Sequence, residues 1–575
     1  MSASGQPVPA GMRIDWDVEI QVRDGLVLRA DVFRPDTDGE YPVILSMGPY
    51  GKGLHFEDGY ASAWQRMHEA YPEVGVGTSG RYQNWELADP EKWIPDGFIL
   101  VRIDSRGAAR SPGYLDILSL TEAHDYYDAI EWAGVQPWSN GRVGLLGISY
   151  YAINQWQVAA LQPPHLHAIC VWEGAVDFYR DVSRHGGILC EFLGGWFERQ
   201  VASHQHGRGS RGGVDRNTGY FVSGDVDFSD ELLEQNRRNP LDVAREKTLD
   251  GQFYDERTAD LSRVQVPLLT AGNWGGQGLH NHGNVEGFML AGSEHKWLEM
   301  HGDNHFSPFY TDRGVAMQKQ FFGTFLRGED NGWMDRPPVE LLVRHPGEKF
   351  VSRFETAWPP ENTQWTKFHL NPQTRELDTT PAAGEPIGYH TLGEGLRFTL
   401  PPTDVDREFS GHVKVHLRVS SQTSDADIFV VLRLLDPNGD EVTFIGSNDP
   451  KVPVGLGWLR ASHRALDPQR STPFRPFHRH DLTEPLVPGE PVDLDIEIWP
   501  TSIVVPPGYT LELAIQGHDY ANSGSTLANQ PYAMSGVGPF LHADATDRPA
   551  EIFDTTVQLH FDADEPPYLQ LPFIE

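Results

Sequence analysis

The sequence predicts two structural parts, an α/β domain built on a parallel sheet and an all-β sandwich that follows it. Three continuous apolar runs, at residues 42–47, 98–104 and 143–146, are typical of strands buried on both faces. Residues 121–132 carry apolar side chains at helical spacing, with acidic residues in the first turn. Strands that alternate with helices favour a parallel sheet covered on both sides.

The other elements of the first part follow in order. Residues 16–22 alternate, Asp24-Gly25 predicts a hairpin turn, and a second strand follows at 26–33. Residues 175–262 lack buried-strand runs, which predicts a mostly helical insertion with a flexible run at 207–213. Further strands are expected at 168–172, 266–272 and 296–300, and a closing helix at 315–326.

The pattern changes beyond Pro337-Pro338. Short alternating segments separated by turns predict a β-sandwich or jelly roll, at 413–419, 427–435, 492–498, 509–515 and 555–561. We therefore expect an α/β domain at 1–174 and 263–335, a cap insertion at 175–262, and a β domain at 340–575.

Composition bounds the function. Among 575 residues, Lys and Arg total 46 and Asp and Glu total 81, a net charge of −35 that argues against nucleic acid or an anionic membrane as partner. Cys170 and Cys190, the two cysteines, are expected to be buried apolar residues. No apolar stretch approaches the length of a membrane span, so we expect a soluble cytoplasmic protein. The sequence leaves open whether the protein forms a homo-oligomer.

One short motif predicts nucleophilic chemistry. The apolar run 143–146 leads into Gly147-Ile148-Ser149-Tyr150, and a helix-like segment follows. This is the layout of a nucleophile elbow, in which a serine on a tight strand-to-helix turn presents its hydroxyl. The backbone N–H of Tyr150 then faces the place where an oxyanion forms. The usual final glycine is replaced by Tyr151.

A base and a second oxyanion donor complete the constellation. His305 follows the predicted strand at 296–300, where this fold order places the histidine that deprotonates the serine. Tyr50, between Pro49 and Gly51 in the loop after the strand at 42–47, can donate its phenol O–H to the oxyanion. The alternatives are that His305 simply lies on a surface loop and that Tyr50 is an aromatic residue packed under its own loop.

These motifs together resemble the cocaine esterase and X-prolyl dipeptidyl peptidase group of serine hydrolases. The resemblance rests on residues 48–52, 104–113 and 147–150, and in the second half on 457–464 and 506–509. It implies an α/β-hydrolase core, a helical cap and a galactose-binding-like jelly roll. It also implies acyl transfer to water through Ser149, with Tyr50 O–H and Tyr150 N–H as the oxyanion pair and without a cofactor.

The sequence departs from that group at the acid of the triad. The group carries an aspartate just after a Trp where this chain has Gly276. We expect Glu173 to replace it, because Glu173 ends the neighbouring strand and can reach the histidine ring. Asp303 and Glu286 are the weaker candidates, and a structural pair between Glu173 and Arg180 is the alternative.

Further residues carry weaker expectations. Four aromatic side chains are candidates for an acyl pocket: Trp172, Trp196, Phe197 and Trp274. His204-x-His206 and His280-x-His282 have ligand-like spacing without a third ligand, so no metal is expected. We expect a serine esterase acting on a small-molecule ester. An X-prolyl dipeptidyl peptidase or α-amino acid ester hydrolase is the alternative within the group, and a non-catalytic binding protein the alternative outside it.

Overall fold

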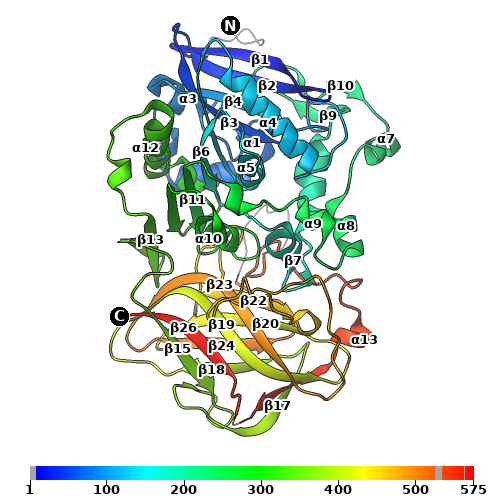
Figure 1. Cartoon of the computed structure of the whole chain (residues 1–575), viewed down its shortest axis with the longest axis vertical. Coiled ribbons are helices and arrows are strands. Elements are labelled where there is room, and N and C mark those ends of the chain that lie inside the picture. The colour runs from blue at the N-terminus through cyan, green and yellow to red at the C-terminus, as the bar shows by residue number, and fades with distance from the viewer. Residues whose placement is uncertain (1–7, 525–533, 563) are drawn as a thin grey trace.

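The chain folds around a mixed sheet that forms the centre of its N-terminal part (Figure 1). The computed structural model describes residues 8–524, 534–562 and 564–575. The first two strands of this sheet are antiparallel to their neighbours, and the seven strands that follow them in space are parallel to one another. Their spatial order is β1 (Met12–Gln21), β2 (Val27–Pro35), β4 (Ile99–Asp104), β3 (Tyr41–Gly48), β5 (Ser139–Ile148), β6 (Leu166–Trp172), β11 (Leu268–Asn273), β12 (Lys296–His301) and β13 (Val339–His345).

Helices cover both faces of this sheet, as the buried apolar runs predict. Along β3, Val43 and Leu45 pack with α4 (Leu120–Gly134) and α5 (Tyr150–Ala160). Ile44 points to the other face and packs with α12 (Asp312–Arg327) and α2 (Ala61–Ala70). Because side chains alternate along a strand, one apolar run supplies two hydrophobic cores. The remaining helices of this part are α1 (Phe56–Gly59), α3 (Pro90–Trp93), α10 (Asn281–Leu290) and α11 (Ser307–Tyr310).

The insertion after β6 differs in part from its prediction. Its helices are short, and two antiparallel strand pairs lie among them, β7 (Arg184–His185) with β8 (Ile188–Leu189) and β9 (Arg208–Val214) with β10 (Phe221–Asp227). The run predicted to be flexible at 207–213 forms most of β9, which corrects that expectation. A Cβ on Gly212 would meet Ser223 Oγ at 1.9 Å, so glycine allows the two strands to approach. The helices are η3 (Phe178–Ser183), α6 (Phe192–Trp196), η4 (Phe197–Val201), η5 (Ala202–His204), α7 (Asp230–Gln235), α8 (Pro240–Glu246), α9 (Gln252–Asp255) and η6 (Leu261–Arg263).

The C-terminal part is a β-sandwich around one core. The long strand β19 (Arg407–Ser421) pairs with β23 (Val492–Val505), β25 (Thr556–Phe561) and β26 (Tyr568–Ile574). Opposite it, β20 (Asp427–Leu435) pairs with β22 (Gly455–Arg460) and β24 (Thr510–Gln516). Apolar side chains of both groups fill the space between them. Edge strands complete the sandwich: β15 (Thr363–Leu370), β17 (Gly384–His390) and β18 (Leu396–Leu400).

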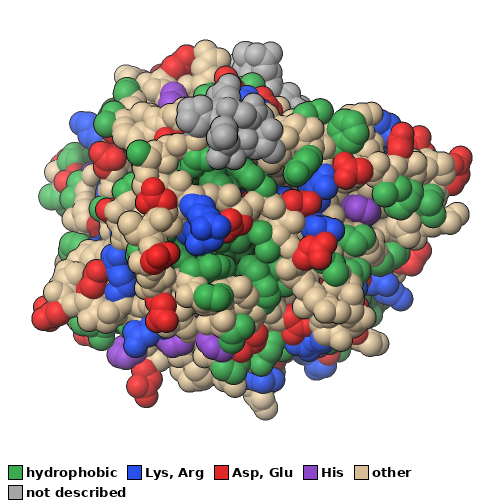
Figure 2. All heavy atoms as spheres, turned by 90° about the horizontal axis from the view of Figure 1, so that it is seen from above, with side chains coloured by type: hydrophobic (Ala, Val, Ile, Leu, Met, Phe, Trp, Pro, Cys, Tyr) green, Lys and Arg blue, Asp and Glu red, His purple; other side chains and the backbone are tan. Residues whose placement is uncertain are grey.

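The surface and the cysteines agree with the composition. Figure 2 shows acidic and basic side chains interspersed over the face that carries the N-terminal part. Within the described residues, no helix is long and apolar enough to cross a membrane. Cys170 and Cys190 are both unpaired and fully buried, as expected.

Candidate active site

Ser149 lies at the turn between β5 and α5 with a backbone that few side chains adopt. Its φ is 58° and its ψ −116°, and a residue held in such a region costs about 1–3 kcal/mol. A Cβ on Gly147 would lie 2.3 Å from that of Tyr151, so the tight turn requires glycine there. This geometry is that of a nucleophile elbow, and it presents the half-buried Ser149 to a cavity.

Glu173 and His305 are brought together at the carboxyl edge of the sheet. Glu173 follows β6 and His305 lies in the loop after β12, and His305 Nδ1 is 2.9 Å from Glu173 Oε2. Burial alone would raise the pKa of Glu173, but His305 and His301 outweigh it and hold that pKa well below its usual range. A buried, ionised carboxylate on Nδ1 orients an imidazole and stabilises its protonated form.

The residues around the acid leave little room for a side chain at position 276. A Cβ there would meet the Ser447 hydroxyl at 3.1 Å, and that hydroxyl donates to Glu173 Oε2 at 2.8 Å. The Ser447 carbonyl also accepts from the backbone N–H of His305, at 3.1 Å. Ser447 belongs to the loop between β21 (Glu441–Val442) and β22, so the C-terminal part supplies a contact to both Glu173 and His305.

The alternative acids have other partners. Glu286, on α10, binds Arg475 at 2.5 Å, and Asp303 accepts from the hydroxyl of Tyr71. Arg180, the alternative partner of Glu173, instead binds Asp177 at 2.8 Å.

Tyr50 and Tyr150 both lie beside the nucleophile, in the wall of the same pocket as Ser149. The indole N–H of Trp196 donates to the Tyr50 hydroxyl oxygen at 3.0 Å, so the phenol proton stays available to an oxyanion. Lys52 N–H donates to the buried Asp104 at 2.6 Å, which fixes the loop that carries Tyr50. The side chain of Tyr150 is held by Glu122 at 2.6 Å, and its backbone N–H lies at the start of α5, where helix N–H groups lack helical partners.

A cavity of about 1040 Å³ opens at Ser149 and His305. A second, apolar pocket of about 20 Å³ also touches Ser149 and Tyr50, and its walls include Leu118 and Phe178. Of the four aromatic residues expected to line an acyl pocket, Trp196 lines both spaces. The expectation is wrong for the other three, which lie outside both walls and pack in hydrophobic cores: Trp172, Phe197 and Trp274.

Two residues that contact the imidazole of His305 were not predicted from the sequence as part of the site. Glu86 Oε1 lies 2.8 Å from His305 Nε2, and His280 stacks on the imidazole with ring centroids 5.0 Å apart. Glu86 sits in an irregular segment with no motif, so the residues alone carried no signal for it. His280 was noted only for its spacing to His282, whose Nδ1 lies 2.6 Å from Asp181.

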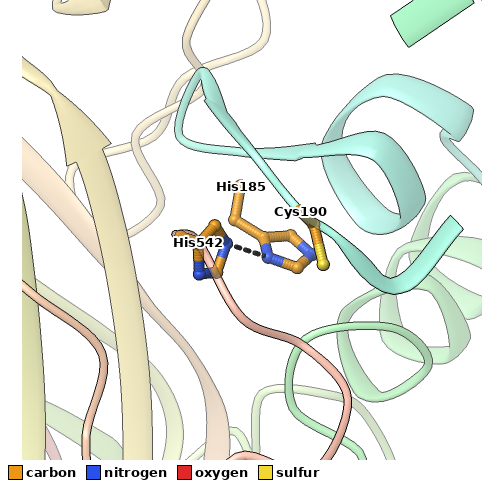
Figure 3. A group of neighbouring side chains, drawn as sticks. All are labelled: His185, Cys190 and His542. Carbon is orange, nitrogen blue, oxygen red and sulfur yellow. Dashed lines mark hydrogen bonds between the residues drawn. The ribbon is translucent and has the colours of Figure 1, made fainter. Parts of the chain in front are cut away.

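Two groups of described residues bring three metal-ligand atoms within 4.8 Å of one another. One is Glu173, His280 and His305, within the site itself. The other is His185, Cys190 and His542, which lie together where the insertion meets the C-terminal part, with the two imidazole rings edge to face (Figure 3). Its ring nitrogens are engaged: His185 Nδ1 with His542 Nε2 at 2.8 Å, and His542 Nδ1 with Asp519 at 2.8 Å. The two histidines are therefore buried and hydrogen-bonded, and the buried Cys190 thiol lies beside them.

Comparison with known proteins follows the same division of the chain. Residues 24–307 match the family model described as X-Pro dipeptidyl-peptidase (S15 family), and residues 331–569 match its C-terminal non-catalytic domain. A putative serine esterase of Mycobacterium tuberculosis is 24% identical over 90% of this chain and 92% of its own length. The cocaine esterase of a Rhodococcus species is 24% identical over 89% of this chain and 93% of its own length.

Solved structures extend the similarity to the whole fold. A CocE/NonD family hydrolase from Staphylococcus aureus is 30% identical and superimposes with a TM-score of 0.85 over 100% of this chain and 98% of its own. An α-amino acid ester hydrolase, 17% identical with a TM-score of 0.69 over 99% of this chain and 98% of its own, shares the fold.

Proposed function

The chain belongs to the CocE/NonD family of serine hydrolases, and from this premise we propose that it cleaves carboxylic esters through an acyl-enzyme on Ser149. The observation that carries the proposal is the contact of His305 Nδ1 with a buried carboxylate beside a strained nucleophile elbow. The carboxylate of Glu173 stands in for the absent aspartate. The missing aspartate was the one feature that favoured a non-catalytic binding protein. With Glu173 in its place, this argument no longer applies.

The mechanism proceeds in two halves. His305 Nε2 takes the proton of Ser149, whose oxygen attacks the ester carbonyl. Tyr50 O–H and Tyr150 N–H donate to the oxyanion, and His305 returns its proton to the departing alcohol. Water then repeats these steps on the acyl-enzyme and releases the acid.

The two spaces at Ser149 support unequal substrate halves. The departing alcohol must receive its proton from His305, which lines the cavity of about 1040 Å³. The acyl group then enters the apolar pocket, whose 20 Å³ is roughly the room of one water-sized group. We therefore propose esters of short acids with large alcohols.

A substrate panel tests this proposal. We expect kcat/KM to be highest for p-nitrophenyl acetate and to fall at the butyrate and again at the hexanoate, because each added methylene exceeds the acyl pocket. Gly-Pro-p-nitroanilide should be cleaved far more slowly than the acetate. A preference for the hexanoate would contradict the short acyl group, and a preference for the anilide would contradict the esterase.

An observation favours the alternative of an α-amino substrate. Glu191 lines the cavity and forms no ion pair within the described residues, whereas Asp177 is bound to Arg180 and lies outside the lining. A carboxylate in that place can receive a substrate ammonium. The anilide in the same panel separates this function from the first.

Tyr50→Phe should lower kcat by about 100- to 1000-fold, because it removes one oxyanion donor and keeps the ring in place. The control is Tyr151→Phe, which removes another phenol hydroxyl. The ring centroid of Tyr151 lies 5.6 Å from that of Tyr50, and Tyr151 does not line the cavity. Steady-state rates on p-nitrophenyl acetate measure both. Equal rates for the Tyr50 variant and the wild type would leave Tyr50 as a packing residue.

We also propose that the protein acts in the cytoplasm. Two buried, unpaired cysteines suit a reducing compartment.

A further inference from the structure

His305 is held between two buried carboxyl groups, one on each ring nitrogen. Glu173 Oε2 lies 2.9 Å from Nδ1 and Glu86 Oε1 lies 2.8 Å from Nε2. Glu86 is 2% exposed, and its other oxygen has no hydrogen-bond partner among the described residues. The triad chemistry accounts for Glu173 alone.

The backbone around Glu86 fixes this contact. Glu86 has a φ of 63°, which is uncommon for a residue with a side chain. Its carbonyl accepts from the backbone N–H of Ile148 at 3.2 Å, one residue before the nucleophile. Glu86 also lines the cavity beside Ser149. The segment is thus tied to the elbow and turns a carboxyl group toward the atom that must take the Ser149 proton.

Nε2 can serve only one partner at a time. In the described residues no hydrogen bond joins the Ser149 hydroxyl to His305, because Nε2 faces Glu86. When Nε2 carries a proton and donates it to ionised Glu86, the imidazole cannot act as a base. Burial would lower the pKa of His305, but Glu173 and Glu86 outweigh it and raise that pKa to about 10. Burial raises the pKa of Glu86.

We propose that Glu86 shares a proton with His305 Nε2 and thereby sets the pH range in which the enzyme works, an inference that rests on the proposed esterase mechanism. When this proton is lost to water as the pH rises, Glu86 stays ionised and a lone pair becomes free on Nε2. His305 keeps the proton on Nδ1 and donates it to Glu173. The free lone pair on Nε2 can then accept the proton of Ser149.

The other titratable neighbours of His305 leave this role to Glu86. His280 stacks on the ring and its own pKa is lowered, chiefly by burial, to about 3, so it is neutral. His301 lies behind Glu173, with 3.5 Å between Nε2 and Oε1, and contacts Glu299 at 2.7 Å. None of these groups touches Nε2.

The pH dependence of kcat/KM for p-nitrophenyl acetate tests the proposal. A carboxylate beside an imidazolium raises the pKa of the imidazole, and the neutral imidazole is the active form. In the wild type, kcat/KM should therefore fall on acidification (the acid limb of the profile) with an apparent pKa above the ordinary histidine value of about 6.5. Glu86→Gln should move it to lower pH by about one to three units, with a similar rate on the alkaline plateau.

Glu286→Gln is the matched control, because it removes a carboxylate that is 3% exposed and outside the cavity lining. Its acid limb should stay in place. A wild-type limb at or below 6.5, or an unmoved limb in an active Glu86→Gln enzyme, would overturn the role of Glu86. A purely structural role would lower the rate at every pH together with the melting temperature. An inactive wild type would instead refute the esterase function itself.

Discussion

Ser149→Ala should abolish ester hydrolysis, with kcat lower by about a millionfold, because the acyl-enzyme cannot form. The residual rate comes from the oxyanion donors and substrate binding, which the substitution leaves in place. Steady-state kinetics on p-nitrophenyl acetate measure the loss. The melting temperature should change little, since the Ser149 hydroxyl forms no hydrogen bond to the triad residues among the described contacts.

Covalent labelling gives an independent check on the nucleophile. A fluorophosphonate should attach to Ser149 in the wild type, and the adduct should be absent from Ser149→Ala. Labelling of another serine, or turnover that survives the substitution, would place the nucleophile elsewhere.

Glu173→Gln should lower kcat by about 10,000-fold, the second largest effect. Glutamine keeps the size of the side chain, but its amide carries no negative charge to stabilise the imidazolium of His305. An amide N–H turned toward Nδ1 would also favour the wrong tautomer. Rates at saturating ester, measured with the melting temperature of each variant, separate catalysis from folding.

The control for Glu173 is again Glu286→Gln, because the sequence offers Glu286 as another candidate acid. Glu286 is bound to Arg475, so its loss should affect stability and leave kcat nearly unchanged. A large loss of kcat in Glu286→Gln with an active Glu173→Gln would reverse the assignment.

The fold could be predicted from the sequence because the patterns that indicate strands and helices are local. Apolar runs such as 143–148 predict buried strands, and parallel strands end at the same edge of a sheet. That edge brings Glu173 next to His305 once β6, β11 and β12 are adjacent, so their proximity could be predicted from strand order. The same reasoning fails for aromatic side chains: Trp172 lies on a strand face that packs in a core, and residue type alone does not select the face.

Contacts made by irregular segments could not be predicted. Glu86 meets His305 across 219 positions of sequence and Ser447 meets Glu173 across 274, and neither lies in a motif or a periodic element. Their positions depend on backbone turns such as the positive φ of Glu86, which no local pattern encodes. The sequence therefore predicts the candidate triad and misses the residues that contact it.

The contact of Ser447 with Glu173 has a consequence for the order of events during synthesis. The N-terminal part leaves the ribosome first, and Ser149, Glu173 and His305 all precede Ser447. Until the loop between β21 and β22 has been made and docked, Glu173 lacks the hydroxyl of Ser447 as a hydrogen-bond donor, and His305 lacks the acceptor of its backbone N–H. The nascent chain thus carries an unfinished hydrolase, and the last domain to fold completes it.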